Sequence, residues 1–163
     1  MNPTERRWSV EESVFVKAPA DRVYAAVADV RSMARWSPEC VAVRGVAAGP
    51  ARTGARFVGF NRKGPFFWFT GCRVTRAEPG VDFAFRVSSF GLPVALWGYR
   101  LAPEADGTRV TEYWRDLRTG RYGKVTQAMG RIFTGTRPEV RHLANEAGMR
   151  ATLERLRREL ESR

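Results

Sequence analysis

The hydrophobic pattern is clearest near the carboxyl end of the chain, in residues 137–161. Four apolar side chains recur there at spacings of four, three and four, which places them on one stripe of an α-helix. They are Met149, Leu153, Leu156 and Leu160. Pro138 suits a first helical turn, and no other proline follows it. We therefore predict a long terminal helix over 137–161 whose leucine stripe packs on an apolar surface.

The same stripe continues backwards to two ionisable residues, Glu146 and His142. Either the helix extends past its core contact at this point, or it faces a cavity. A second apolar stripe complicates the choice, because His142 and Glu146 point away if that stripe packs inward. Its members are Val140, Leu143, Ala144, Ala147 and Ala151. The sequence leaves the rotation of the helix open.

Upstream of the helix, the pattern changes to alternating strands separated by turns rich in glycine and proline. Residues 8–17 predict a strand, and 22–30 and 31–36 predict two short helices. Six further strands are expected at 41–46, 55–61, 66–76, 81–88, 94–102 and 108–117. Glycines interrupt residues 118–136, for which we predict a loop with some helical turns.

Connections this short make neighbouring strands antiparallel, so the strands predict a meander. Together the elements predict an α+β fold, in which a curved seven-stranded antiparallel sheet wraps around the terminal helix. A chain of 163 residues with 44% hydrophobic content has room for one core. We expect a single domain over 1–163.

The sequence also bears on where the protein is located and on the redox state of its cysteines. No apolar run approaches the roughly 20 residues needed to span a bilayer, and no apolar run follows the first residues as in a signal peptide. We therefore expect a cytoplasmic protein without integral membrane association. Cys40 and Cys72 are too sparse for a disulfide framework and favour reduced thiols, although a single bridge between them stays open.

The net charge of +11 at pH 7 raises the question of a nucleic-acid partner. The arginines are scattered along the chain rather than gathered in one run, which favours a solvated basic surface. We expect no nucleic acid among the partners. Monomer and homodimer both stay open.

Several phrases of the sequence resemble a known family. They are Val14-Phe15-Val16-Lys17-Ala18-Pro19, Val23-Tyr24-Ala25-Ala26-Val27-Ala28-Asp29, Trp36-Ser37-Pro38, Trp97-Gly98-Tyr99-Arg100-Leu101 and Gly148-Met149-Arg150-Ala151-Thr152-Leu153. With the order of elements, they are similar to the START-like (SRPBCC) helix-grip superfamily, which includes Bet v 1-like proteins, and most of all to its bacterial polyketide cyclase/dehydrase-like branch. The resemblance implies a deep cavity between sheet and helix that binds a hydrophobic or aromatic small molecule, lipids included.

Strand parity identifies the side chains that would face such a cavity. The inward positions are Phe57, Trp68, Phe83, Phe85, Trp97 and Tyr99, joined by Val110, Glu112 and Trp114 if the last strand keeps Val110 inward. As ligand-binding residues we predict Phe57, Trp68, Phe85, Trp97, Tyr99, Trp114 and Met149. Each of these also suits a plain core position, so the aromatic content alone does not distinguish a filled core from a cavity.

The acid/base candidates are few. We predict Tyr99, Glu112, His142 and Glu146 as catalytic residues if the protein is an enzyme. His142 and Glu146 lie one helical turn apart and form either a pair at the cavity mouth or an exposed surface pair. Glu112 at an inward position would be costly to bury alone, so we expect it to pair with Arg100 or Arg56 or to contact a ligand.

Motifs for other chemistry are missing from the sequence. It contains no glycine-rich phosphate loop, no Gly-x-Ser-x-Gly elbow and no Cys/His cluster, so we expect no cofactor and no metal. Three functions stay open. The first is binding of a hydrophobic small molecule, the second is a polyketide cyclase, aromatase or dehydratase, and the third is a protein-interaction module whose cavity is filled by its own side chains.

Overall fold

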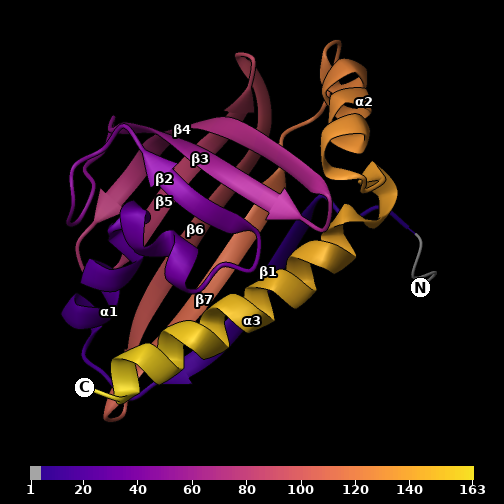
Figure 1. Cartoon of the computed structure of the whole chain (residues 1–163). Helices are drawn as coiled ribbons and strands as arrows, with labels where there is room; N and C mark the ends of the chain where they lie inside the picture. Colours follow the sequence, from indigo (N-terminus) through magenta and orange to yellow (C-terminus); the bar gives the residue numbers. More distant parts are fainter. Residues whose placement is uncertain (1–4) are drawn as a thin grey trace.

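The computed structural model describes residues 5–163 (Figure 1). The elements in chain order are β1 (Ser9–Val16), α1 (Ala20–Ala28), the 3-10 helix η1 (Val30–Arg35), β2 (Cys40–Arg44), β3 (Arg56–Lys63), β4 (Phe66–Glu78), β5 (Asp82–Ser89), β6 (Leu92–Glu104), β7 (Gly107–Asp116), α2 (Gly123–Thr134), the 3-10 helix η2 (Pro138–Val140) and α3 (Arg141–Glu161). The prediction of one domain over 1–163 includes residues 1–4, which lie outside the described residues.

The strands form one antiparallel sheet of seven strands in the order β1-β7-β6-β5-β4-β3-β2. Strands β2 to β7 form the predicted meander, and β1 pairs with β7 at the other edge, with Val10 opposite Trp114 and Val14 opposite Val110. Figure 1 shows the sheet curving around α3. The predicted α+β helix-grip architecture is therefore confirmed.

The leucine stripe of the terminal helix packs on this sheet as predicted. Its side chains Met149, Leu153, Leu156 and Leu160 are buried, with at most 6% of each exposed. The helix itself begins later than predicted, at Arg141. Pro138 begins a separate 3-10 turn, and Val140 has φ −111° and ψ 1°, which lies outside the α-helical region and separates the two segments.

The two short helices after β1 cover one end of the sheet. Helix α1 begins directly after Pro19, two residues earlier than predicted, and buries Val23 and Val27. Both valines lie on the face predicted from their spacing. The amino-terminal helices therefore complete the hydrophobic core at the end of the sheet that lies near the carboxyl terminus (Figure 1).

Residues 118–136 differ from the prediction. We expected a loop with some helical turns, whereas the structure contains a helix of twelve residues, α2, from Gly123 to Thr134. Glycine weakens helix propensity by about 1 kcal/mol relative to alanine, which obscured the pattern. Gly130 has a packing role, because a Cβ placed there would come within 3.1 Å of the Arg118 guanidinium. Gly135 ends the helix in a left-handed conformation with φ 66°.

Candidate functional site

A cavity of about 460 Å³ lies between the sheet, α3 and α2. Its walls come from β3 to β7, from the region of η1 and from the cavity-facing sides of the two helices. The volume is within the range of small-molecule sites in proteins. Because this space is open, the premise of the interaction module, a cavity filled by side chains, does not hold.

Aromatic side chains form most of the apolar wall. All seven residues predicted to contact a ligand line the cavity: Phe57, Trp68, Phe85, Trp97, Tyr99, Trp114 and Met149. Phe57 packs edge-on against Phe85 with ring centroids 5.4 Å apart. The strand-parity assignment is thus confirmed for position, while ligand binding by these residues stays a prediction. Phe83 and Val110, two other inward positions, are fully buried in the core.

A buried polar feature of the cavity wall is the pair formed by Tyr99 and Glu112. The two residues are directly opposite each other on β6 and β7, and the Tyr99 hydroxyl donates a hydrogen bond of 3.2 Å to Glu112 Oε1. Glu112 is only 4% exposed, and its second oxygen, Oε2, is buried without a hydrogen-bond partner. Both residues line the cavity, so its wall carries a polar atom whose hydrogen-bonding capacity is unused.

Burial dominates the electrostatics of this pair. Desolvation raises the pKa of Glu112 to about 8, although the hydrogen bond from Tyr99 opposes the shift. Burial and the neighbouring Glu112 also raise the pKa of Tyr99. At neutral pH the Glu112 carboxyl is therefore mainly protonated, and it can donate a hydrogen bond as well as accept one.

The predicted arginine partners of Glu112 lie elsewhere. Arg100 forms an ion pair with Glu11 at the surface. Arg56 is exposed and lies opposite Arg73 on the outer face of the sheet. Arg100 follows the inward Tyr99 on β6, and Arg56 precedes the inward Phe57 on β3. Because successive side chains of a strand point to opposite faces, both arginines lie on the outer face of the sheet, away from the cavity. Of the two alternatives predicted for Glu112, pairing with arginine is wrong.

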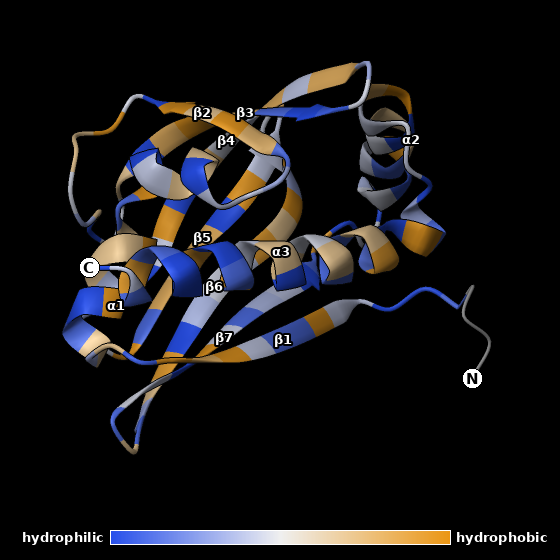
Figure 2. Ribbon diagram, turned by 60° about the horizontal axis from the view of Figure 1, so that its bottom comes forward, coloured by the Kyte–Doolittle hydropathy of each residue, from blue (hydrophilic) through white to orange (hydrophobic). Residues whose placement is uncertain are grey.

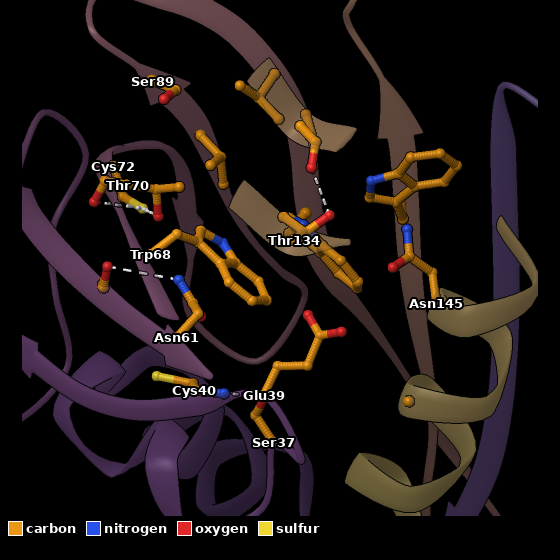
Figure 3. A pocket seen from close by; sticks show the side chains of 18 of the residues that line it. Ser37, Glu39, Cys40, Asn61, Trp68, Thr70, Cys72, Ser89, Thr134 and Asn145 are labelled. Carbon is orange, nitrogen blue, oxygen red and sulfur yellow. Dashed lines mark hydrogen bonds between the residues drawn. The ribbon is translucent and has the colours of Figure 1, made fainter. Parts of the chain in front are cut away.

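A second polar group on the cavity wall was missed by sequence reasoning. Arg141, at the start of α3, forms an ion pair of 2.5 Å with Glu39, and its guanidinium lies 6.0 Å from the centroid of the Trp68 ring. All three residues line the cavity, and Arg141 Nη1 is buried without a partner. Figure 3 shows Glu39 and Trp68 across the cavity from Asn145 of α3. Only its place in the helical pattern could have indicated this role. Arg141 lies eight residues, or about two helical turns, before Met149 and therefore near the same side of the helix.

The structure places His142 and Glu146 away from the cavity wall. His142 is 2% exposed, and its Nδ1 accepts a 3.5 Å hydrogen bond from the backbone N–H of Arg7. Glu146 pairs with the guanidinium of Arg7 at 2.5 Å. The cavity-facing side of α3 instead carries Arg141, Ala144, Asn145, Gly148, Met149 and Thr152. His142 and Glu146 thus fix the amino-terminal segment to α3, and only Tyr99 and Glu112 of the four catalytic candidates meet at the cavity.

Both cysteines are buried on the cavity wall as free thiols. Burial raises the pKa of Cys40 to about 11 and that of Cys72 to about 12. Each thiol is therefore protonated at neutral pH and acts as a small apolar wall residue, not as a nucleophile. The open alternative of a bridge between them is not realised in the structure.

A buried charge cluster lies on the cavity wall near α2. Arg118 lines the cavity and donates two hydrogen bonds to Asp116 from its guanidinium, at 2.9 and 2.8 Å. Arg6 adds a third contact to Asp116 at 2.7 Å. Burial alone would raise the pKa of Asp116, but the bonds from Arg118 and Arg6 outweigh it and lower the pKa. This cluster fixes the exit of β7 and the start of the segment that leads to α2.

Two absences hold for residues 5–163. No helix in this part of the chain is long and apolar enough to cross a membrane. The same residues contain no group of three or more His, Cys, Asp or Glu side chains arranged to hold a metal ion.

The fold and cavity define a helix-grip protein with an internal cavity. Comparison with known proteins gives the family. Residues 7–161 match the model of the family described as polyketide cyclase / dehydrase and lipid transport, and the chain belongs to that family. A search of curated proteins gives no match.

Solved structures support the same assignment. A polyketide-cyclase-like protein of Corynebacterium glutamicum is 30% identical, with a TM-score of 0.62 over 94% of this chain and 91% of its own. A Chromobacterium violaceum protein is 18% identical with a TM-score of 0.67 over 95% and 99%, which shows the fold alone. A protein from the dynemicin biosynthetic locus is 26% identical with a TM-score of 0.50, over 85% of this chain and 48% of its own.

Proposed function

We propose that the protein binds a hydrophobic, aromatic-sized small molecule that carries a carbonyl or hydroxyl group. The observation that supports this most directly is the unpartnered Oε2 of Glu112 in an otherwise largely apolar cavity. A buried polar atom without a hydrogen bond costs free energy, and a ligand oxygen placed against it removes that cost. The aromatic walls would hold the rest of the molecule.

Two matched probes test this proposal. 2-Acetylnaphthalene and 2-ethylnaphthalene have nearly the same shape, but only the first carries a carbonyl. Binding of each is followed by quenching of tryptophan fluorescence, because Trp68, Trp97 and Trp114 line the cavity. We expect the ketone to bind about tenfold more tightly, since one buried hydrogen bond contributes about 1 kcal/mol or slightly more.

Substitutions at Glu112 test whether this residue causes the preference for the ketone over the hydrocarbon. E112L should make the two affinities equal, whereas E112Q, which keeps a donor, should preserve the preference. E104L is the matched control, because Glu104 is exposed at the end of β6. Equal affinity of the wild-type protein for both probes, or no saturable quenching by either, would contradict the proposal.

The alternative function is a polyketide cyclase or dehydratase, and the same pair of residues favours it. The pKa of Glu112, about 8, lets one carboxyl take a proton and return it near neutral pH. In an intramolecular aldol step, ionised Glu112 would accept the proton from a carbon between two carbonyls. The resulting enolate would attack a second keto carbon, and Glu112 would return the proton to the alkoxide before water leaves.

The family and the protein from a biosynthetic locus support this alternative. The test is incubation with a synthetic poly-β-keto thioester and mass spectrometry for loss of one water. E112Q should abolish the product and Y99F should lower its rate, whereas H142A should have little effect because His142 does not line the cavity. Turnover unchanged in E112Q would exclude Glu112 as the acid/base group.

A further inference from the structure

An exposed apolar rim surrounds the opening of the cavity. Phe67, Phe69, Phe90 and Phe133 all line the cavity, yet they are 57, 53, 71 and 43% exposed. They come from β4, from the turn between β5 and β6 and from α2. Phe90 and Phe133 flank the opening. Phe67 and Phe69 alternate with the inward Trp68 along β4 and lie beside Phe60, so they extend the apolar surface onto the outer face of the sheet.

Helix α2 extends the rim outward. Tyr122, at its start, and Val125 and Ile132 within it recur at spacings of three and seven, which places them on one helical face. They are 58, 50 and 70% exposed, and none of them lines the cavity. Figure 1 shows α2 standing at the end of the molecule far from the carboxyl terminus. In Figure 2 the ribbon of α2 carries both hydrophobic and hydrophilic positions.

Basic side chains predominate near the rim, and of the two glutamates that border its segments, Glu39 and Glu139, the first is paired with Arg141. Residues 40–77, 83–103 and 117–138, which supply the rim, contain no aspartate or glutamate. Their basic residues close to the rim are exposed, and none forms an ion pair within the described part of the chain. These residues are Arg62, Lys63, Arg121, Lys124, Arg131 and Arg137.

We propose that this rim docks on the surface of an anionic membrane, with the cavity opening facing the lipid. Contiguous apolar patches on a soluble surface mark interaction sites, and apolar side chains combined with lysine and arginine are typical of helices that lie in a membrane interface. Anionic headgroups would neutralise the basic residues, which face no acidic side chain on these segments. Docking in this way is peripheral, in agreement with the lack of a spanning helix among residues 5–163.

The position of the rim favours lipid over an acidic protein as the partner. Phe67 and Phe69 lie in the first residues of β4, Phe90 in a hairpin turn and Phe133 on α2, beside an opening that leads to an apolar cavity. A bilayer provides an apolar phase directly at this opening, so a hydrophobic molecule can pass into the cavity without crossing water. A folded protein partner would instead have to bury the rim and close the opening.

Vesicle flotation tests the docking. The purified chain is mixed with vesicles of pure phosphatidylcholine, or of phosphatidylcholine with 30% phosphatidylglycerol, at 50 and 500 mM NaCl. We expect binding to the anionic vesicles only, weaker but still detectable at high salt because the apolar contact is not screened. Binding that disappears completely at high salt, or that is equal on both vesicles, would overturn the proposal.

Substitutions on the outer face of α2 locate the contact without altering the cavity. The double variant V125S/I132S should lower vesicle binding about tenfold or more, since it removes two exposed aliphatic side chains from the contact. R131E should lower it by a similar factor by reversing one charge near the surface. The matched controls are V81S and R52E. Val81 is exposed in the turn between β4 and β5, and Arg52 is exposed in the loop before β3, so both lie far from the β3–β4 hairpin that carries Phe67.

The outcomes separate this proposal from the proposed function. V125S/I132S should bind 2-acetylnaphthalene with unchanged affinity in the absence of vesicles, because neither residue lines the cavity. If V81S and R52E reduce vesicle binding as much as the rim variants do, general charge explains the binding and the proposal fails. It also fails if light scattering shows a dimer that V125S/I132S converts to monomers, because a second copy then covers the rim.

Discussion

Tyr99 and Glu112 face each other across two neighbouring strands, and the phenol donates a 3.2 Å hydrogen bond to one carboxyl oxygen. This pair leaves the other oxygen of Glu112 without a partner in a buried, mainly aromatic cavity. The arrangement costs stability and leaves an unsatisfied polar atom at the wall of the cavity. Sites of this kind, where a buried ionisable group is incompletely paired, are typical of binding and catalysis.

The first prediction concerns the pH dependence of stability. The pKa of Glu112 is about 8 in the folded protein and has an ordinary value of 4.5. Between these values the folded state holds a proton that the unfolded state lacks, so stability falls as pH rises. The contribution of this one group is about 1.4 kcal/mol per pH unit in that window, and it is constant outside it.

Urea unfolding of the wild-type protein and of E112Q between pH 4 and 9 measures this effect. Glutamine keeps the shape but does not titrate, so the difference in unfolding free energy between the two proteins should change in favour of E112Q from about pH 5 to pH 8. E104Q is the surface control and should follow the wild-type curve. Parallel curves for E112Q and the wild type would show that Glu112 titrates normally.

The second prediction concerns the buried charge cluster at the end of β7. D116A removes the carboxylate that pairs with Arg118 and Arg6, and leaves the Arg118 guanidinium buried without a counter-charge. We expect a loss of about 3–5 kcal/mol in the free energy of unfolding. The control D106A removes an exposed partner of Lys17 and should cost less than about 1 kcal/mol. Chemical denaturation measures both, and similar small losses would contradict the assignment.

The sequence predicts the parts of the fold that depend on periodicity. The alternation of Val110, Glu112 and Trp114 identifies the inward face of β7, and the spacing of Met149, Leu153 and Leu156 identifies the helix that the sheet surrounds. Both patterns follow from backbone geometry, which local sequence determines. They are sufficient to predict part of the aromatic cavity wall, but not Phe90 in a turn or Phe133 on α2, which also line the cavity.

Other features depend on tertiary contacts that local sequence does not contain. The rotation of α3 is determined by Arg7, which contacts both His142 and Glu146 from more than 130 positions away in the chain. Arg141 becomes a cavity residue only because Glu39 and Trp68 come close to it in the fold. Helix α2 was missed because Gly130 lowers its propensity, although the close approach of Arg118 favours glycine there.

The third prediction separates the two sides of α3. G148L places a large side chain on the cavity side of the helix, where a Cβ would have ordinary contact with Pro38. It should weaken binding of 2-acetylnaphthalene at least about tenfold by occupying the site, while leucine favours the helix over glycine by roughly 1 kcal/mol. H142A should instead lower stability, because it removes a buried side chain, and leave probe affinity unchanged.

Fluorescence titration and thermal unfolding of both variants distinguish these effects. Weaker probe binding in H142A at a temperature where it is fully folded would place His142 in the site and contradict the orientation of α3. L143A serves as the control on the exposed side of the helix, and it should change neither property by much, since Leu143 is 42% exposed.

The last prediction concerns close packing on the outer face of the sheet. Tyr113 lies opposite Gly98 on the neighbouring strand, and a Cβ added to Gly98 would overlap the Tyr113 ring. The ring is held in place by its hydroxyl, which donates a 2.8 Å hydrogen bond to Asp82. G98A should therefore cost about 1–3 kcal/mol through overpacking. Alone, Y113A should also destabilise the sheet, because it uncovers Gly98 and removes the bond to Asp82.

The double variant G98A/Y113A makes this prediction specific. Once the ring is absent, alanine fits the strand without overlap, so the second substitution should cost little or even stabilise the protein. The two effects should thus be non-additive by about 1 kcal/mol or more in a double-mutant cycle measured by urea unfolding. Additive losses would mean that Gly98 is required for backbone conformation, not for the space that the Tyr113 ring occupies.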